Sequence, residues 1–134
     1  MATPPDTTTM MSIAVIDDDP GCLQLMEDVL QMQGYHTIVP TKGEDAYNLI
    51  LRKHPDLIIL DIRMNQDALS GWHILERIWA DHIVDHTPVI VCTADIFFLR
   101  KMSARLLLYG YQVLEKPFDI RELEACIAKA FRTT

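Results

Sequence analysis

A chain of 134 residues suits one domain of ordinary size, and 49% hydrophobic residues are enough for a packed core. The formal net charge of −7 argues against nucleic acid as a direct partner, because phosphate binding needs a basic face. No apolar run is long enough to span a membrane and the start lacks a signal-peptide core, so we expect a cytoplasmic protein without a membrane partner.

Residues 1–11 are predicted to form a flexible polar leader, and residues 12–134 a single domain. Short apolar runs predict strands, and apolar residues at helical spacing predict the helices between them. In chain order, these are strand 12–16, helix 20–34, strand 35–39, helix 43–54, strand 56–60, helix 71–81, strand 87–93, helix 95–110, strand 111–115 and helix 119–132. Asp119, with Glu122 three residues later, is expected to cap the last helix.

Five successive strand–helix units predict an α/β fold, a doubly wound parallel sheet with helices on both faces. The run 56–60 (DLIIL) is almost continuously apolar, as expected for a strand buried on both faces. No internal repeat or linker divides the chain, which favours a single domain.

Polar residues stand where the predicted strands end. They are Asp17 and Asp18 after the first strand, Asp61 after the third, Thr93 at the end of the fourth and Lys116 after the fifth. Ligands of open parallel sheets bind at the carboxyl ends of the strands, so these side chains are expected to converge. Carboxylate oxygens are hard ligands suited to Mg²⁺. The sequence therefore predicts a divalent-cation site, whose carboxylates repel by about 4 kcal/mol for a pair about 4 Å apart near a protein surface.

Asp61 is the candidate nucleophile at this edge, because it ends the central buried strand alone. A carboxylate beside Mg²⁺, a hydroxyl and a lysine forms a phosphoryl acceptor site, in which an aspartate can become an acyl phosphate. Taken alone, the acidic run 17–19 fits a solvated turn that caps a helix equally well. The presence of Thr93 and Lys116 at the same edge favours the acceptor site.

Four stretches in this order, VIDDDP, DLIILDIRM, PVIVCTA and EKPFD, resemble the receiver domain of two-component response regulators over residues 12–132. The resemblance is to the stand-alone, chemotaxis-regulator type. It implies a flavodoxin-like (βα)5 fold with the strand order 2-1-3-4-5. It also implies a phosphoprotein of a two-component or phosphorelay system, and not a turnover enzyme.

The resemblance further implies the roles of single residues. Asp61 would take a phosphoryl group from a histidine kinase or a histidine phosphotransfer protein, and the modified form would bind a downstream effector. Thr93 and Lys116 would contact the phosphoryl oxygens. Asp19 would point away from the site, toward the following helix. The groups that would hold Mg²⁺ or Mn²⁺ are Asp17, Asp18, Asp61 and the backbone carbonyl of Arg63.

Two departures from the family pattern concern signal read-out and the loop after Asp61. Val113 occupies the switch position, where receivers usually carry a tyrosine or phenylalanine. The loop before Gly71 is about two residues longer than usual, with Ser70 where an aspartate is frequent. At the mouth of the site, we hypothesise an approach of Arg63 to Asp95 that modulates the lifetime of the acyl phosphate.

The segment 95–110 has more apolar residues than one buried helix face needs. Phe97, Phe98 and Leu108 are therefore candidates for a partner surface, or for a homodimer contact through the fourth helix and fifth strand. A broad core stripe is the alternative explanation.

Three other functions compete with the acceptor switch. A pseudo-receiver would bind a partner and never be phosphorylated, and Val113 favours it slightly. A Mg²⁺-dependent phosphohydrolase usually has a second aspartate two residues after its nucleophile, where this chain has Arg63. A flavin protein would need a hydroxyl-rich phosphate loop, but the loop after the first strand is acidic.

Overall fold

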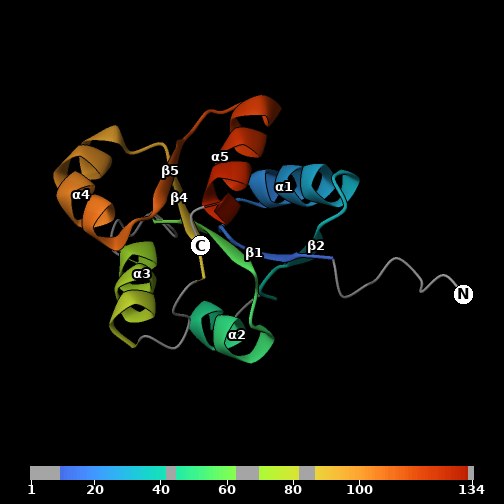
Figure 1. The fold of residues 1–134 in the computed structure, drawn as a ribbon, viewed down its shortest axis with the longest axis horizontal. Helices are drawn as coiled ribbons and strands as arrows, with labels where there is room; N and C mark the ends of the chain where they lie inside the picture. Colours follow the sequence, from blue (N-terminus) through green and yellow to red (C-terminus); the bar gives the residue numbers. More distant parts are fainter. Residues whose placement is uncertain (1–9, 42–44, 63–69, 82–86, 133–134) are drawn as a thin grey trace, which may run out of the picture.

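The computed structural model describes residues 10–41, 45–62, 70–81 and 87–132, and strands alternate with helices along them (Figure 1). The elements are β1 (Ser12–Ile16), α1 (Pro20–Met32), β2 (His36–Ile38), α2 (Ala46–Lys53), β3 (Leu57–Asp61), α3 (Ser70–Asp81), β4 (Val89–Thr93), α4 (Ile96–Tyr109), β5 (Gln112–Glu115) and α5 (Ile120–Arg132). Residues 1–9 of the predicted leader lie outside the described residues. None of the described helices is both long and apolar enough to cross a bilayer.

The five strands form one sheet in the order β2-β1-β3-β4-β5, and every neighbouring pair is parallel. The predicted fold class and strand order are thus confirmed. β3 is the central strand, paired with β1 up to Ile16↔Leu60 and with β4 up to Asp61↔Cys92. This position explains why every residue of β3 is buried.

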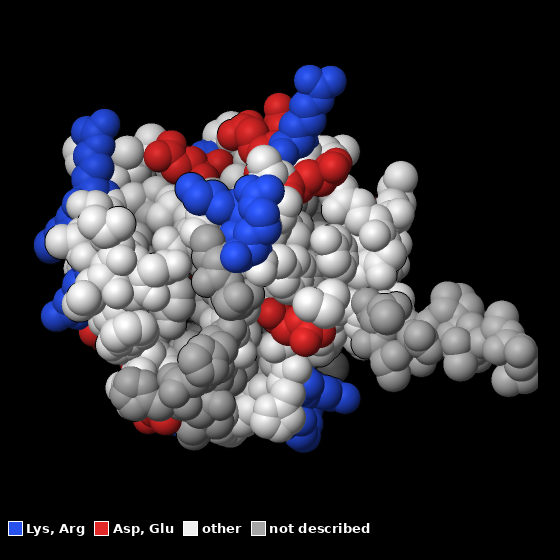
Figure 2. Space-filling view, viewed as in Figure 1, with Lys and Arg blue, Asp and Glu red and all other residues white. Residues whose placement is uncertain are grey.

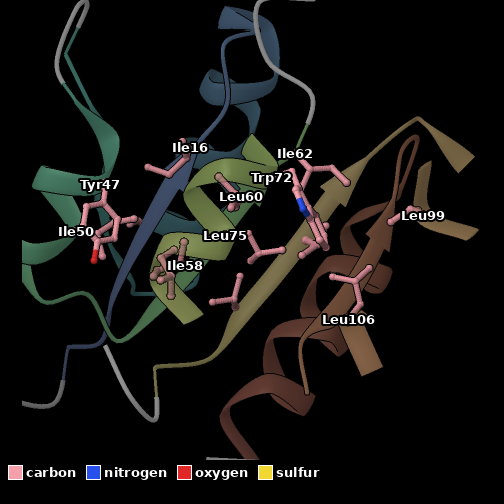
Figure 3. Close-up of a cluster of buried hydrophobic side chains, with 14 residues drawn as sticks. Ile16, Tyr47, Ile50, Ile58, Leu60, Ile62, Trp72, Leu75, Leu99 and Leu106 are labelled. Carbon is pink, nitrogen blue, oxygen red and sulfur yellow. The ribbon is translucent and has the colours of Figure 1, made fainter. Parts of the chain in front are cut away.

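Alternate side chains of the strands enter two separate hydrophobic clusters, one on each face of the sheet. On one face, Ile58 and Leu60 pack with buried residues of α2, α3 and α4, among them Trp72 and Leu75 (Figure 3). On the other face, the strands pack with α1 and α5. Figure 1 shows α1 and α5 together on one side of the sheet and α2 and α3 on the other.

Several element ends differ from the predicted ones, and local capping explains the case of α2. The helix begins at Ala46 because the Asp45 carboxylate accepts hydrogen bonds from the backbone N–H groups of Tyr47 and Asn48. It ends at Lys53 because His54 turns into the left-handed region, with φ of 49°. The strand predicted over 35–39 is also shorter, since only His36–Ile38 pair in the sheet.

The predicted cap of α5 is present. The Glu122 backbone N–H donates to Asp119 Oδ1 at 2.8 Å, and the Asp119 backbone N–H donates to Glu122 Oε1 at 3.2 Å. This reciprocal pair satisfies donors at the start of the helix and holds the turn between β5 and α5.

All three cysteines are free. Burial raises the pKa of the Cys22 thiol to about 11 and the pKa of the Cys92 thiol to about 12, and it also raises the pKa of Cys126. The thiols are therefore protonated at neutral pH.

Candidate functional site at the carboxyl edge of the sheet

Four strands deliver the predicted polar residues to one edge of the sheet. Asp61 and Thr93 are the last residues of β3 and β4, with exposed fractions of 7% and 1%. Asp17 directly follows β1, and Lys116 directly follows β5. Because neighbouring parallel strands end side by side, residues far apart in the chain become neighbours here.

Three carboxylates form the acidic part of the site. Asp17, Asp18 and Asp61 each offer an oxygen within 4.8 Å of the others. Carboxylate oxygens at this spacing suit a hard cation such as Mg²⁺ or Mn²⁺, which binds few protein groups and keeps several waters. Arg63, the fourth predicted ligand, lies outside the described residues.

Lys116 joins two of these acids. Its Nζ donates to Asp17 Oδ2 at 2.7 Å and to Asp61 Oδ2 at 3.1 Å. Burial alone would lower the pKa of Lys116, but the hydrogen bonds and charges of Asp17 and Asp61 together raise it well above its usual value. Lys116 therefore remains an ammonium group and offsets the repulsion between the carboxylates.

The backbone near Lys116 is fixed to the neighbouring strand. The Lys116 backbone N–H donates to the carbonyl oxygen of Thr93 at 3.0 Å. This hydrogen bond holds the backbones of the two residues next to each other at the edge of the site. The Thr93 hydroxyl oxygen accepts from the backbone N–H of Asp95 at 3.1 Å. The buried hydroxyl thus has a defined orientation at the rim of the site.

Asp19 is not a member of the cluster of Asp17, Asp18 and Asp61, and it serves the following helix, as the resemblance implied. Its carboxylate caps α1 by accepting from the Gly21 N–H at 3.2 Å, and its own N–H donates to Asp17 Oδ1 at 3.0 Å. The triplet is therefore divided, with one residue capping a helix and two belonging to the site.

Asp95 caps α4, since its Oδ1 accepts from the Phe98 N–H at 3.0 Å. Its expected approach to Arg63 stays a prediction, because Arg63 lies outside the described residues. The capping role could have been recognised from an aspartate that directly precedes an apolar helical run.

Two hollows meet at Lys116. One has a volume of about 460 Å³ and is lined by Asp61, Thr93, Ala94, Asp95, Ile96, Phe97 and Lys116. The other, of about 490 Å³, is lined by Asp19, Gly21, Cys22, Leu25, Ala94, Lys116, Pro117 and Phe118. The first hollow gives access to the Asp61 carboxylate, so a small phosphodonor or a protein side chain could reach it there.

Gly71 and Cys22 are near the site but were not among the predicted site residues. Gly71 packs against the backbone of Asp61 and Ile62. Cys22 lies beside Asp17 and Lys116, whose charges act on its thiol. No sequence signal marks these contacts, because each depends on how a helix packs against the strand ends.

The predicted partner surface is only partly exposed. Phe97 is 86% exposed and Leu108 is 72% exposed, and Leu107, which was not predicted, is 83% exposed. Phe98 differs from the expectation, because its ring packs edge-on against Trp72 with centroids 5.7 Å apart.

Val113, the predicted switch position, is 41% exposed and lines a groove between α4 and β5. The groove has a volume of about 320 Å³. Tyr111 packs against Trp79 and Tyr109 instead of occupying this position.

On the face drawn in Figure 2, acidic and basic side chains are interspersed and form no continuous basic surface.

A family model described as the response regulator receiver domain matches residues 13–128. The chain belongs to this family. This chain is 33% identical over 129 residues to a probable transcriptional regulator, ycf27, of Guillardia theta. The match covers 96% of this chain and 48% of that protein. The chain is 32% identical over 110 residues to the polar-differentiation response regulator DivK of Brucella ovis, covering 81% of this chain and 86% of DivK.

The chain spans about half the length of the first of these relatives. Among solved structures, the chemotaxis protein CheY4 of Vibrio cholerae matches this chain with a TM-score of 0.76 at 20% identity. The match covers 91% of this chain and 99% of CheY4. The receiver domain of the sensor histidine kinase PA1611 from Pseudomonas aeruginosa matches with a TM-score of 0.75 at 25% identity, over 92% and 99% of the two chains. That structure has a magnesium ion coordinated in its active-site cleft.

Proposed function

We propose that this receiver domain is a phosphoacceptor switch of a two-component or phosphorelay system. A histidine kinase or a histidine phosphotransfer protein would donate the phosphoryl group to Asp61, and the modified form would bind a downstream effector. The observation that carries the proposal is the placement of Asp61. It shares one site with two further carboxylates and with the ammonium group of Lys116.

Asp17, Asp18 and Asp61 would hold Mg²⁺ or Mn²⁺, with the backbone carbonyl of Arg63 as a further ligand. Bound there, the ion would neutralise charge on the phosphoryl oxygens. The magnesium ion in the receiver domain of PA1611 supports this assignment. Mg²⁺ prefers oxygen ligands, and the site offers carboxylate oxygens at suitable spacing.

In the transfer step, a carboxylate oxygen of Asp61 attacks the phosphorus atom of the donor. The bond between phosphorus and the donor's imidazole nitrogen breaks, the electron pair stays on that nitrogen, and the nitrogen takes up a proton from water. The Thr93 hydroxyl and the Lys116 ammonium donate hydrogen bonds to the phosphoryl oxygens. Lys116 need not be recruited from elsewhere, because it already lies 3.1 Å from Asp61.

The same reasoning extends to the setting of the protein. The acyl phosphate would be lost by slow hydrolysis, so the chain would act as a switch and not as a turnover enzyme. We propose the cytoplasm as its compartment, since its three free cysteines suit a reducing environment. The exposed residues Phe97 and Leu108 would contribute to an effector contact or to a homodimer through α4 and β5.

A pseudo-receiver is the second candidate, favoured by the absence of an aromatic side chain at Val113. The distinguishing experiment is incubation with MgCl₂ and acetyl phosphate, followed by intact-mass measurement. We expect one added phosphoryl group, and its loss in Asp61→Asn. Asp56→Asn is the matched control, because Asp56 precedes the same strand at its opposite end and binds Ser12.

No adduct on the wild-type protein would favour the pseudo-receiver. Continuous release of phosphate from phosphate esters would favour an enzyme. An adduct that persists in Asp61→Asn would show that another residue is the acceptor.

A further inference from the structure

Gly71, the second residue of α3, is buried against the end of β3. A Cβ atom at this position would lie 2.2 Å from the carbonyl oxygen of Asp61 and 2.4 Å from the Cα of Ile62. Atoms that are not bonded do not approach so closely. Among the glycines that the structure describes, Gly34 and Gly110 have positive φ, and Gly71 does not. Close approach of two backbones, and not an unusual backbone conformation, therefore requires glycine here.

We propose that Gly71 is a positioning residue for the phosphoacceptor. Its missing side chain lets the first turn of α3 pack directly on the Asp61–Ile62 backbone. This contact keeps the Asp61 carboxylate at its short distances from Asp17, Asp18 and Lys116. The inference deepens the proposed function and rests on it.

A side chain at position 71 has to displace either α3 or the end of β3. α3 is firmly anchored, because Leu75 and Ile78 are buried, and Figure 3 shows Leu75 and Trp72 within the buried cluster. The Trp72 ring also packs against the rings of Phe98 and Tyr109. An ion pair of 2.8 Å between Glu76 and Arg105 also ties α3 to α4.

The end of β3 is held less firmly. In the sheet, its pairing with β1 ends at Ile16↔Leu60, whereas its pairing with β4 extends to Asp61↔Cys92. Ile58 to Leu60 pair with a neighbouring strand on both sides, which confines any shift to the last residue of the strand and to Ile62. A side chain on residue 71 is therefore expected to move Asp61 and to leave α3 in place.

Such a movement matters because the site depends on short distances. Asp61 lies 3.1 Å from the Lys116 ammonium, and its carboxylate lies within 4.8 Å of those of Asp17 and Asp18. A displacement of about 1 Å at a reacting group can cost on the order of a hundredfold in rate. The nucleophilic oxygen would also lose its alignment with the cation site.

The test compares Gly71→Ala with Gly21→Ala in the full chain. Gly21 lies in the first turn of α1, beside the same site, and a Cβ there would meet only Asp19 Oδ1 at an ordinary 3.7 Å. Two quantities are measured for each protein. They are the rate constant of phosphorylation by acetyl phosphate, per folded molecule, and the dissociation constant for Mg²⁺ alone, from tryptophan fluorescence.

We expect Gly71→Ala to lower the phosphorylation rate constant at least about tenfold and to weaken Mg²⁺ binding, while Gly21→Ala keeps both values. In the reaction, an Asp61 oxygen forms a bond to phosphorus, the phosphorus–oxygen bond of acetyl phosphate breaks, and acetate leaves with the electron pair. Wild-type-like values in Gly71→Ala would overturn the inference.

Leu75→Ala separates positioning from loss of stability, because Leu75 is a fully buried residue of the same helix that does not line the site. It should lower the unfolding temperature and keep the rate constant per folded molecule. Equal rate losses in Leu75→Ala and Gly71→Ala would also overturn the inference. If Gly71→Ala is unfolded in buffer, the three variants are compared in trimethylamine N-oxide, which favours the compact state.

The inference and the proposed function fail in different ways. A wild-type protein that acetyl phosphate does not modify would refute the proposed function. The Mg²⁺ titration would then still decide whether Gly71 positions Asp61. A modified wild-type protein with unchanged Gly71→Ala values would refute only the role of Gly71.

Discussion

Lys116 is the residue on which the charge balance of the site depends. One ammonium group serves two carboxylates from different strands, and its side chain is only 20% exposed. Removing one partner of a largely buried charge cluster leaves the remaining charges uncompensated, which destabilises more than the loss of a surface ion pair. A divalent cation at the same carboxylates would compensate them in the place of Lys116.

We therefore predict that Lys116→Met is less stable than the wild type by about 1 to 3 kcal/mol in EDTA. Because its carboxylates lack an internal cation, added Mg²⁺ should raise its unfolding temperature more than that of the wild type. Thermal unfolding in EDTA and in MgCl₂ measures both effects. Lys129→Met, at an exposed position of α5, is the control and should behave as the wild type. A smaller Mg²⁺ response in Lys116→Met than in the wild type would contradict the prediction.

At the scale of elements, α2 and α3 are joined by a buried tyrosine. The Tyr47 hydroxyl donates to the carboxylate of Asp81 at the end of α3, and the Arg77 guanidinium lies 3.9 Å from the centre of the Tyr47 ring. Burial, and then the hydrogen bond to Asp81, raises the pKa of Tyr47 to about 12 from its ordinary value near 10. The contact between α2 and α3 through Tyr47 and Asp81 therefore depends on a protonated phenol.

The pKa of Tyr47 predicts how the stabilisation by the Tyr47–Asp81 hydrogen bond depends on pH. Since the folded state holds the phenol proton more tightly than the unfolded state, the stabilisation is complete below pH 10 and is lost as the pH rises toward 12. We predict that Tyr47→Phe costs about 1 to 2 kcal/mol at pH 8, and that its difference from the wild type shrinks between pH 10 and pH 12. Urea unfolding at pH 8 and at pH 11 provides the measurement. A difference that stays constant or grows over this range would argue against the role of the phenol.

At the scale of the whole molecule, the central strand supplies both hydrophobic clusters and also the candidate nucleophile. Leu60 is fully buried and precedes Asp61 directly, whereas Val113 lies on the edge strand and is 41% exposed. The interior and the edge of the sheet should therefore differ strongly in their tolerance of truncation.

We predict that Leu60→Ala lowers the free energy of unfolding by about 2 to 5 kcal/mol and Val113→Ala by less than about 1 kcal/mol. Urea unfolding at pH 7 tests both. Similar losses in the two variants would show that β5 belongs to the core more fully than its exposure indicates.

The sequence was sufficient for much of this fold, because apolar runs and strand-end polar residues are local signals. Asp17, Asp61, Thr93 and Lys116 were predictable because parallel strands carry whatever follows them to one edge. The cap by Asp45 lies within a predicted helix and was missed, since helix ends depend on the turn that the backbone adopts.

Long-range packing explains the remaining differences. Phe97 and Phe98 are consecutive and both apolar, yet one is exposed and the other lies against Trp72 of another helix. The contact of Gly71 with the Asp61 backbone likewise joins segments whose relation no local pattern gives. In both cases the orientation of a helix on the sheet decided the outcome.

The protonated state of the three native cysteines has a practical consequence for testing the proposed switch. Maleimides react with thiolates, so at neutral pH Cys22, Cys92 and Cys126 should label slowly. A new thiol placed on the surface of α4, as in Leu108→Cys, would be exposed to solvent and would take up a dye faster than the native thiols. The wild-type background would then need no cysteine removal before a fluorophore on that helix is used to test for the proposed partner contact.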